Sequence, residues 1–124
     1  MAAETPSSPK PMTRQQALRL WRMALTDTVR GKGPDLSSRQ LAIMLTVYLS
    51  PPPHTVRGLA AGLKVSKPAV SRALDALAKL GFLRRKPDPA DKRSVLLERT
   101  VKGSVHLTDF ADAVVRAWRA LEES

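Results

Sequence analysis

The residues best suited to chemistry in this sequence are Ser, Lys and Arg side chains that gather between Ser66 and Arg93. Residues 55–100 hold eleven Lys and Arg against four acidic residues, whereas residues 101–124 hold three against four. Guanidinium and ammonium groups bind phosphate oxygens, and a guanidinium also binds guanine O6 and N7 bidentately. Together with a formal net charge of +10, this uneven distribution indicates a polyanion, and first of all a nucleic acid, as the partner.

Catalytic chemistry has little support in the sequence. Cys is absent, His54 and His106 are isolated, and no Gly-rich phosphate loop is found. We therefore expect no enzyme activity, no metal and no cofactor. No apolar run approaches the roughly 20 residues of a membrane span, and no signal-peptide pattern is found, so we expect a cytoplasmic protein.

Two helices are expected before the basic region. Residues 1–12 are rich in Pro, Ser, Thr and Ala and are expected to form a disordered tail. An apolar stripe at three- to four-residue spacing predicts a first helix over residues 13–31, and a second begins at Ser37 or Ser38 and stops before Pro51. The stripe of the first helix is Leu18, Trp21, Leu25 and Val29. The expected buried face of the second is Leu41, Met44, Leu45 and Tyr48.

A helix-turn-helix followed by a β-ribbon is expected from residue 55 onward. Thr55 and Ser66 are predicted N-caps of two short helices, and Gly81 ends the second of them. The buried face of that second helix is predicted to be Val70, Ala73, Leu74 and Leu77. Residues 82–86 and 94–98 are strand-length segments around a polar tip, which indicates a wing, and a last helix is expected beyond Gly103.

The outer face of the second short helix is the expected DNA reader. That face carries Pro68, Ser71, Arg72, Asp75 and Lys79. Arg72 is the preferred base reader, and Arg93, oriented by Asp91, is expected to enter a minor groove from the wing tip. Plain capping and solvation are the alternative roles of Ser66 and of the wing charges. The predicted DNA-binding residues are Ser66, Lys67, Pro68, Ser71, Arg72, Arg84, Lys86, Asp91, Lys92 and Arg93.

These residues resemble the multiple antibiotic resistance regulator (MarR) family of bacterial winged-helix transcription factors. The resemblance covers approximately residues 37–103 and rests on LAAGLKVSKPAVSRALDALAKLGFLRR from Leu59 and on DKRSVLLERTVKG from Asp91. In this family an Asp-x-Arg wing leads into a strand and then into a Thr-x-x-Gly that starts the dimerisation helix. Arg99 stands where the family usually has Leu.

The resemblance implies a homodimer that binds palindromic DNA, and often repression that a small aromatic acid relieves. The N- and C-terminal helices, residues 13–31 and 103–122, would then form the dimer around a DNA-binding core, residues 37–102. Because only 21 residues follow Gly103, we expect one C-terminal helix where the family commonly has two. The expected dimer residues are Leu18, Trp21, Leu25, Phe110, Val114 and Trp118. The aromatic rings that would line an effector pocket, or else the core, are Trp21, Tyr48, His54, His106 and Trp118.

The expected fold is therefore mainly α with a small β-wing, a winged helix-turn-helix in a single domain over residues 13–124. The expected function is sequence-specific binding of double-stranded DNA by a homodimeric, nucleoid-associated transcriptional repressor. Two alternatives stay open: a winged-helix module that binds proteins, and a non-specific DNA-binding protein. RNA binding would favour exposed aromatic side chains for stacking, and the few aromatics here fall mostly on faces predicted to be buried.

Overall fold

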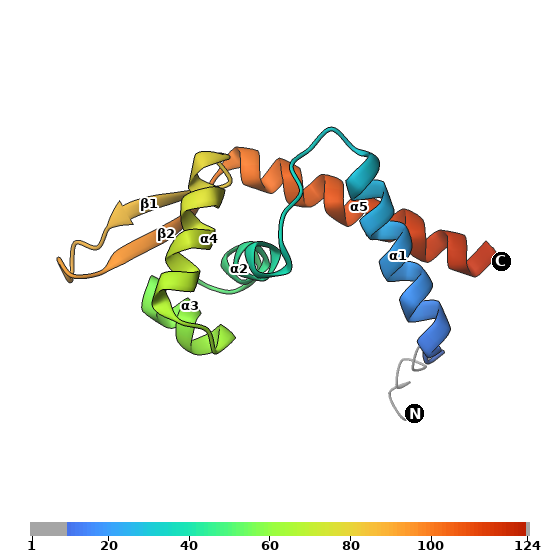
Figure 1. The fold of residues 1–124 in the computed structure, drawn as a ribbon, viewed down its shortest axis with the longest axis horizontal. Coiled ribbons are helices and arrows are strands. Elements are labelled where there is room, and N and C mark those ends of the chain that lie inside the picture. Colours follow the sequence, from blue (N-terminus) through green and yellow to red (C-terminus); the bar gives the residue numbers. More distant parts are fainter. Residues whose placement is uncertain (1–9, 124) are drawn as a thin grey trace, which may run out of the picture. The chain divides into compact units, whose positions relative to one another are not determined.

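Five helices and a two-stranded sheet make up residues 10–123, the part of the chain that the computed structural model describes (Figure 1). The elements are α1 (Arg14–Arg30), α2 (Ser38–Leu49), α3 (Val56–Leu63), α4 (Lys67–Lys79), β1 (Leu83–Pro87), β2 (Val95–Arg99) and α5 (Val101–Glu123). The expected mainly helical fold with a small β-wing is confirmed. Of the expected tail, residues 1–9 lie outside the described residues.

The chain divides into two compact units. One consists of residues 34–109, and the other, within the described residues, of residues 10–33 together with residues 110–123. Helix α5 contributes its first turns to the former and its remainder to the latter. Among residues 10–123, no helix has both the length and the apolar character that a membrane span requires.

Four helices begin at the hydroxyl residues that the sequence predicted. In each, the side-chain oxygen accepts a hydrogen bond from the backbone N–H three residues later, which satisfies one donor of the open first turn. The capping pairs are Thr13 with Gln16, Ser37 with Gln40, Thr55 with Gly58 and Ser66 with Ala69. In α1 and α2 the glutamine also accepts from the N–H of the capping residue, which completes a capping box.

The core of residues 34–109 lies between α2, α3, α4 and the base of the ribbon. The predicted buried face of α4, Val70, Ala73, Leu74 and Leu77, is confirmed. The prediction for α2 was wrong in part: Ile43 and Val47 are fully buried beside Met44, while Leu41, Leu45 and Tyr48 are half-buried. Helix α2 is apolar on most of its circumference, so periodicity alone does not determine which side meets the core.

The two strands form an antiparallel ribbon that extends from α4 (Figure 1). Arg85 pairs with Leu97 and Pro87 with Val95. Both strands begin one residue later than predicted. The Phe82 N–H donates to the Leu77 carbonyl at the end of α4 at 2.9 Å, so Phe82 is not part of the ribbon. A lone bridge between Thr55 and Leu96 ties the ribbon to the segment before α3.

A hydrogen-bonded joint holds the start of α5 against the wing. The Tyr48 hydroxyl donates to the Phe82 carbonyl at 2.6 Å and accepts from Thr100 N at 2.9 Å. Thr100 Oγ1 donates to the Gly81 carbonyl at 2.7 Å and accepts from Gly103 N at 2.9 Å. Thr100 therefore acts as the helix cap, and α5 begins at Val101 rather than beyond Gly103 as predicted.

His106 packs on the other side of this joint. Its ring stacks on Phe82 with centroids 4.5 Å apart, and Lys102 Nζ lies 5.9 Å from the centroid of the same ring. Burial lowers the pKa of His106, and the nearby Asp109 carboxylate partly opposes this shift. The histidine is therefore part of the packed base of α5.

In the second unit, α1 packs on α5 through small side chains. Ala24 of α1 and Ala113 and Ala117 of α5 are buried there, and Arg116 binds Asp27 at 3.1 Å. Leu18 and Trp21 face outward, with 71% and 59% of their surface exposed. The predicted apolar stripe thus forms, but the chain's own helices do not cover it.

Candidate nucleic-acid interface

Helices α3 and α4 form the helix-turn-helix predicted from the sequence. Lys64 ends α3 in the left-handed conformation, with φ of 57°, and Val65 N donates to the Ala60 carbonyl at 3.1 Å. Ser66 then caps α4, where Pro68 occupies the first turn without losing a hydrogen bond. The tight turn fixes α4 against α3, as DNA reading by the second helix of such a motif requires.

The outer face of α4 is the exposed face that the prediction required. Lys67, Pro68, Arg72, Asp75 and Lys79 are exposed, and Ser71 is half-buried. Among the described residues, the Arg72 guanidinium has one contact, a long 3.5 Å bond from Nε to the Pro68 carbonyl. Its two outer nitrogen atoms therefore remain available for a base edge or a phosphate.

The N-terminus of α4 offers one backbone donor to a phosphate. The Ser66 oxygen accepts from Ala69 N at 3.2 Å, so the capping role of Ser66 is confirmed, and Pro68 has no N–H. The Lys67 amide remains, next to the exposed ammonium group of the same residue. This arrangement suits a single phosphate oxygen, because the helix dipole and the side chain both favour negative charge there.

The wing concentrates cations on one face of its ribbon. Arg84 and Glu98 pair across the strands at 3.3 Å, and Lys86 lies 4.0 Å from the same carboxylate. One acid thus balances two cations that stay exposed, with 68% and 56% of their side-chain surface accessible. The remaining positive charge is free to attract phosphates.

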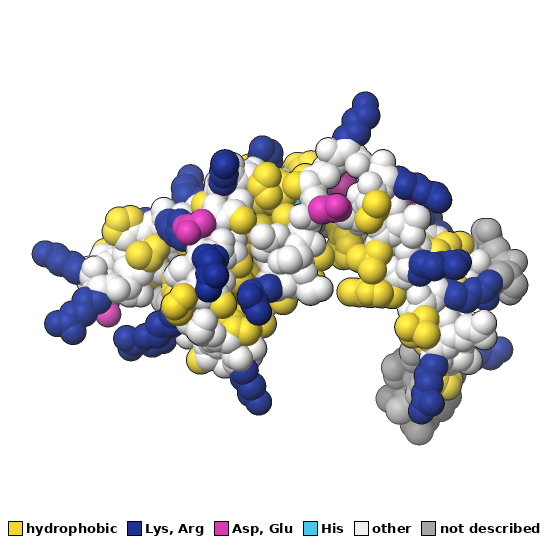
Figure 2. Space-filling view, viewed as in Figure 1, with side chains coloured by type: hydrophobic (Ala, Val, Ile, Leu, Met, Phe, Trp, Pro, Cys, Tyr) yellow, Lys and Arg dark blue, Asp and Glu magenta, His cyan; other side chains and the backbone are white. Residues whose placement is uncertain are grey.

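At the wing tip, acidic side chains shape the turn. Asp91 Oδ1 accepts from Arg93 N at 3.0 Å, and Asp88 Oδ1 accepts from Ala90 N at 2.9 Å. Asp91 therefore orients the backbone of Arg93, as expected, while the side chains of Lys92 and Arg93 are exposed. Figure 2 shows dark-blue side chains over α4 and at the free end of the ribbon.

Two arginines have partners that sequence reasoning missed. Arg99 donates to the carbonyls of Val47 and Ser50 at 2.9 and 3.0 Å, which satisfies the C-terminus of α2. Arg85 binds Asp75 of α4 at 2.6 Å. Arg99 contacts residues about 50 positions away in the chain, and Arg85 contacts a different element. No local sequence pattern predicts either contact.

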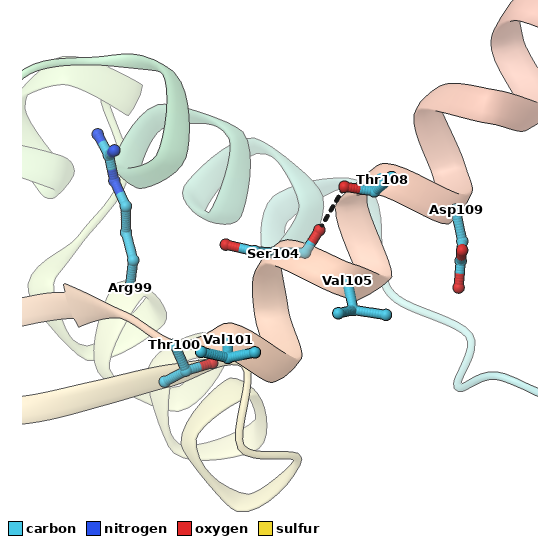
Figure 3. Close-up of a pocket in the computed structure, with 7 residues that line it drawn as sticks. All are labelled: Arg99, Thr100, Val101, Ser104, Val105, Thr108 and Asp109. Carbon is cyan, nitrogen blue, oxygen red and sulfur yellow. Dashed lines mark hydrogen bonds between the residues drawn. The ribbon is translucent and has the colours of Figure 1, made fainter.

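Hollows mark the surface of each of the two units. A groove of about 430 Å³ runs along the start of α5, where Val101 and Val105 line it and the Arg99 guanidinium points away from them (Figure 3). His54 lines a separate hollow of about 340 Å³, and Trp118 a third, in the other unit. Within residues 10–123, no group of three His, Cys, Asp or Glu side chains is placed to hold a metal ion.

Comparison with known proteins identifies the relatives of this arrangement. Residues 36–95 match the model of the MarR family, and no curated protein matches the sequence. The transcriptional regulator Tm0710 of Thermotoga maritima is 25% identical, with a TM-score of 0.64 over 89% of this chain and 72% of that one. The transcriptional repressor CouR, solved with a 23-mer DNA duplex, is 26% identical, with a TM-score of 0.69 over 89% and 75%. A MepR mutant of S. aureus, 19% identical, shares the fold with a TM-score of 0.74 over 89% and 78%.

Proposed function

We infer from the match of residues 36–95 to the MarR family model that this chain is a DNA-binding transcriptional regulator of that family, and from that premise we propose that it is a homodimeric repressor of palindromic operators. The members of this family are regulators and not enzymes. The observation that carries the proposal is the exposed face of α4, where Arg72 stands without a strong partner beside a cationic wing. A repressor role is supported by the likeness to CouR, which is itself a transcriptional repressor bound to DNA.

The contacts that we assign to DNA follow from this surface. Arg72 and Ser71 read base edges in the major groove, while Ser66, Lys67 and Pro68 approach a phosphate at the start of α4. From the wing, Arg84 and Lys86 attract the backbone, and the tip inserts into the flanking minor groove. The residues of that tip are Asp91, Lys92 and Arg93. As a DNA-bound regulator, the protein would act in the cytoplasm, on the nucleoid.

Dimerisation is proposed from the uncovered apolar side chains of the second unit. Leu18, Trp21 and Trp118 are exposed, and two helices alone cannot bury such large groups from water. A second copy with a two-fold axis would cover the same surface on both chains. The proposed interface consists of Leu18, Trp21, Leu25, Phe110, Val114 and Trp118. Two recognition helices would then reach half-sites about one helical turn apart.

The variant Arg72→Ala tests base reading. We expect a loss of about 1–3 kcal/mol on the operator, confined to one base position in each half-site, because one bidentate contact disappears. Binding to a set of duplexes, each with one base pair changed, measures this loss. An equal loss on every duplex would instead make Arg72 a phosphate contact.

The variant Arg93→Ala tests the wing tip. We expect weaker binding to all duplexes and a salt dependence that is shallower by about one phosphate contact, because Arg93 neutralises backbone charge in the groove. The slope of log affinity against log salt concentration measures it, with Arg72→Ala as the comparison. An unchanged slope would remove Arg93 from the groove.

A further inference from the structure

An ion pair joins the recognition helix to the wing. Arg85 Nη2 lies 2.6 Å from Asp75 Oδ1 and 3.4 Å from the carbonyl oxygen of Ser71, one helical turn earlier on α4. In β1, Arg85 alternates with Arg84 and Lys86 and thus stands on the opposite face of the ribbon. The Arg85 guanidinium of the wing therefore contacts α4 at two residues, one helical turn apart.

The other acidic residues of this region act within the wing itself. Between residues 55 and 100 these are Asp88, Asp91 and Glu98. The two aspartates accept from backbone N–H groups of the tip, and Glu98 binds cations of its own ribbon. Asp75 differs because it links two separate elements and places a negative charge on the face of α4 that would meet DNA. Such a charge opposes phosphate binding, so a contribution to general affinity does not explain it.

We propose that Arg85 and Asp75 are positioning residues for sequence recognition, a role that rests on the proposed function. Their ion pair fixes the wing relative to α4, so the base contacts of the helix and the groove contacts of the tip form together only on a duplex of matching shape. The pair also holds Arg85 away from the phosphate backbone. Both effects lower binding to unrelated DNA relative to the operator.

Four variants of the full chain test this role. Arg85→Gln and Asp75→Asn each break the ion pair, their double variant tests whether the two residues act as a unit, and Arg84→Gln is the control for wing mobility alone, since Arg84 is itself proposed to attract the DNA backbone. Arg84 is the neighbouring arginine of the same strand, but its partner Glu98 belongs to the ribbon and not to α4. The measurements are affinity for the promoter duplex and a scrambled duplex at several salt concentrations, and NMR backbone relaxation of the wing in the free protein.

For Arg85→Gln we expect roughly two- to fivefold weaker promoter binding, the range of an exposed ion pair, a smaller loss on the scrambled duplex from the unpaired Asp75 charge, and an unchanged salt slope. Asp75→Asn frees Arg85 to contact the DNA phosphates. Affinity for the scrambled duplex should therefore rise, and the salt dependence of binding should become steeper by about one phosphate contact. The double variant should keep the promoter loss of Arg85→Gln without its loss on the scrambled duplex, because the unpaired Asp75 charge is gone. Both single variants should mobilise the wing, whereas Arg84→Gln should not.

Two results would overturn the role of the pair. One is an equal loss on both duplexes for Arg85→Gln with a shallower salt slope, which would make Arg85 a phosphate contact. The other is wing relaxation that stays the same in Arg85→Gln and Asp75→Asn. If the unaltered protein binds both duplexes equally, the proposed function fails instead, and the relaxation data still decide whether the pair positions the wing.

Discussion

Replacing Gly103 by Ala will lower the free energy of unfolding by about 3 kcal/mol or more, at the upper end of the range for overpacked sites. A Cβ atom at this position would overlap the Tyr48 hydroxyl and the Phe82 carbonyl oxygen. Because one of the two obstacles is backbone, the overlap cannot be relieved by a side-chain rotation. The joint among α2, the wing and α5 would have to open, with loss of the Tyr48 hydrogen bonds.

Chemical denaturation of Gly103→Ala beside Gly62→Ala measures this effect. A Cβ atom on Gly62 meets nothing within 4 Å, and the residue lies inside α3, so that variant should be unchanged or more stable by up to about 1 kcal/mol. If Gly103→Ala unfolds at the same denaturant concentration as the unaltered protein, the Tyr48 joint is not part of the stable fold.

Leu18→Glu will convert the protein to monomers and weaken operator binding by about a hundredfold or more. Leu18 lies on the exposed stripe of α1, and two unpaired carboxylates at a two-fold interface would be costly to bury. Loss of the second recognition helix removes the gain from bivalent binding, which is about 10²- to 10⁴-fold.

Sedimentation and operator binding check this variant, with Leu49→Glu as the control. Leu49 ends α2 and is 78% exposed, yet it lies outside the proposed interface. The control adds the same charge outside the proposed interface, so it should remain dimeric. A Leu18→Glu protein that is still dimeric would exclude α1 from the interface, and equal dissociation of both variants would point to a general effect of charge.

Local sequence patterns predicted most of the fold, because helix capping and apolar spacing depend on residues that are close together in the chain. Ser37 (or Ser38), Thr55 and Ser66 were recognised as helix starts since a capping hydroxyl acts within three residues, while the start at Thr13 followed from the apolar stripe of α1. The buried face of α4 followed from its spacing, since its polar and apolar sides are distinct. The tight turn and the wing that place the candidate DNA-binding residues together were predictable for the same reason.

The remaining features depend on distant contacts that no local pattern encodes. The start of α5 at Val101 depends on Thr100, whose hydroxyl also reaches Gly81. The core face of α2 depends on which of its apolar sides the neighbouring helices cover. The stripe of α1 was recognised from its spacing, but the spacing alone does not say that α5 leaves it uncovered.

The most direct test of sequence-specific DNA binding is a titration of the purified protein against the duplex upstream of its own gene and a scrambled duplex of equal length. At two salt concentrations, we expect tight binding that favours the upstream duplex and weakens by about 10³- to 10⁵-fold between 50 and 200 mM salt, as for 6–10 phosphate contacts. Equal affinity for both duplexes would contradict sequence-specific recognition, and binding to neither would make the winged helix a module for protein partners.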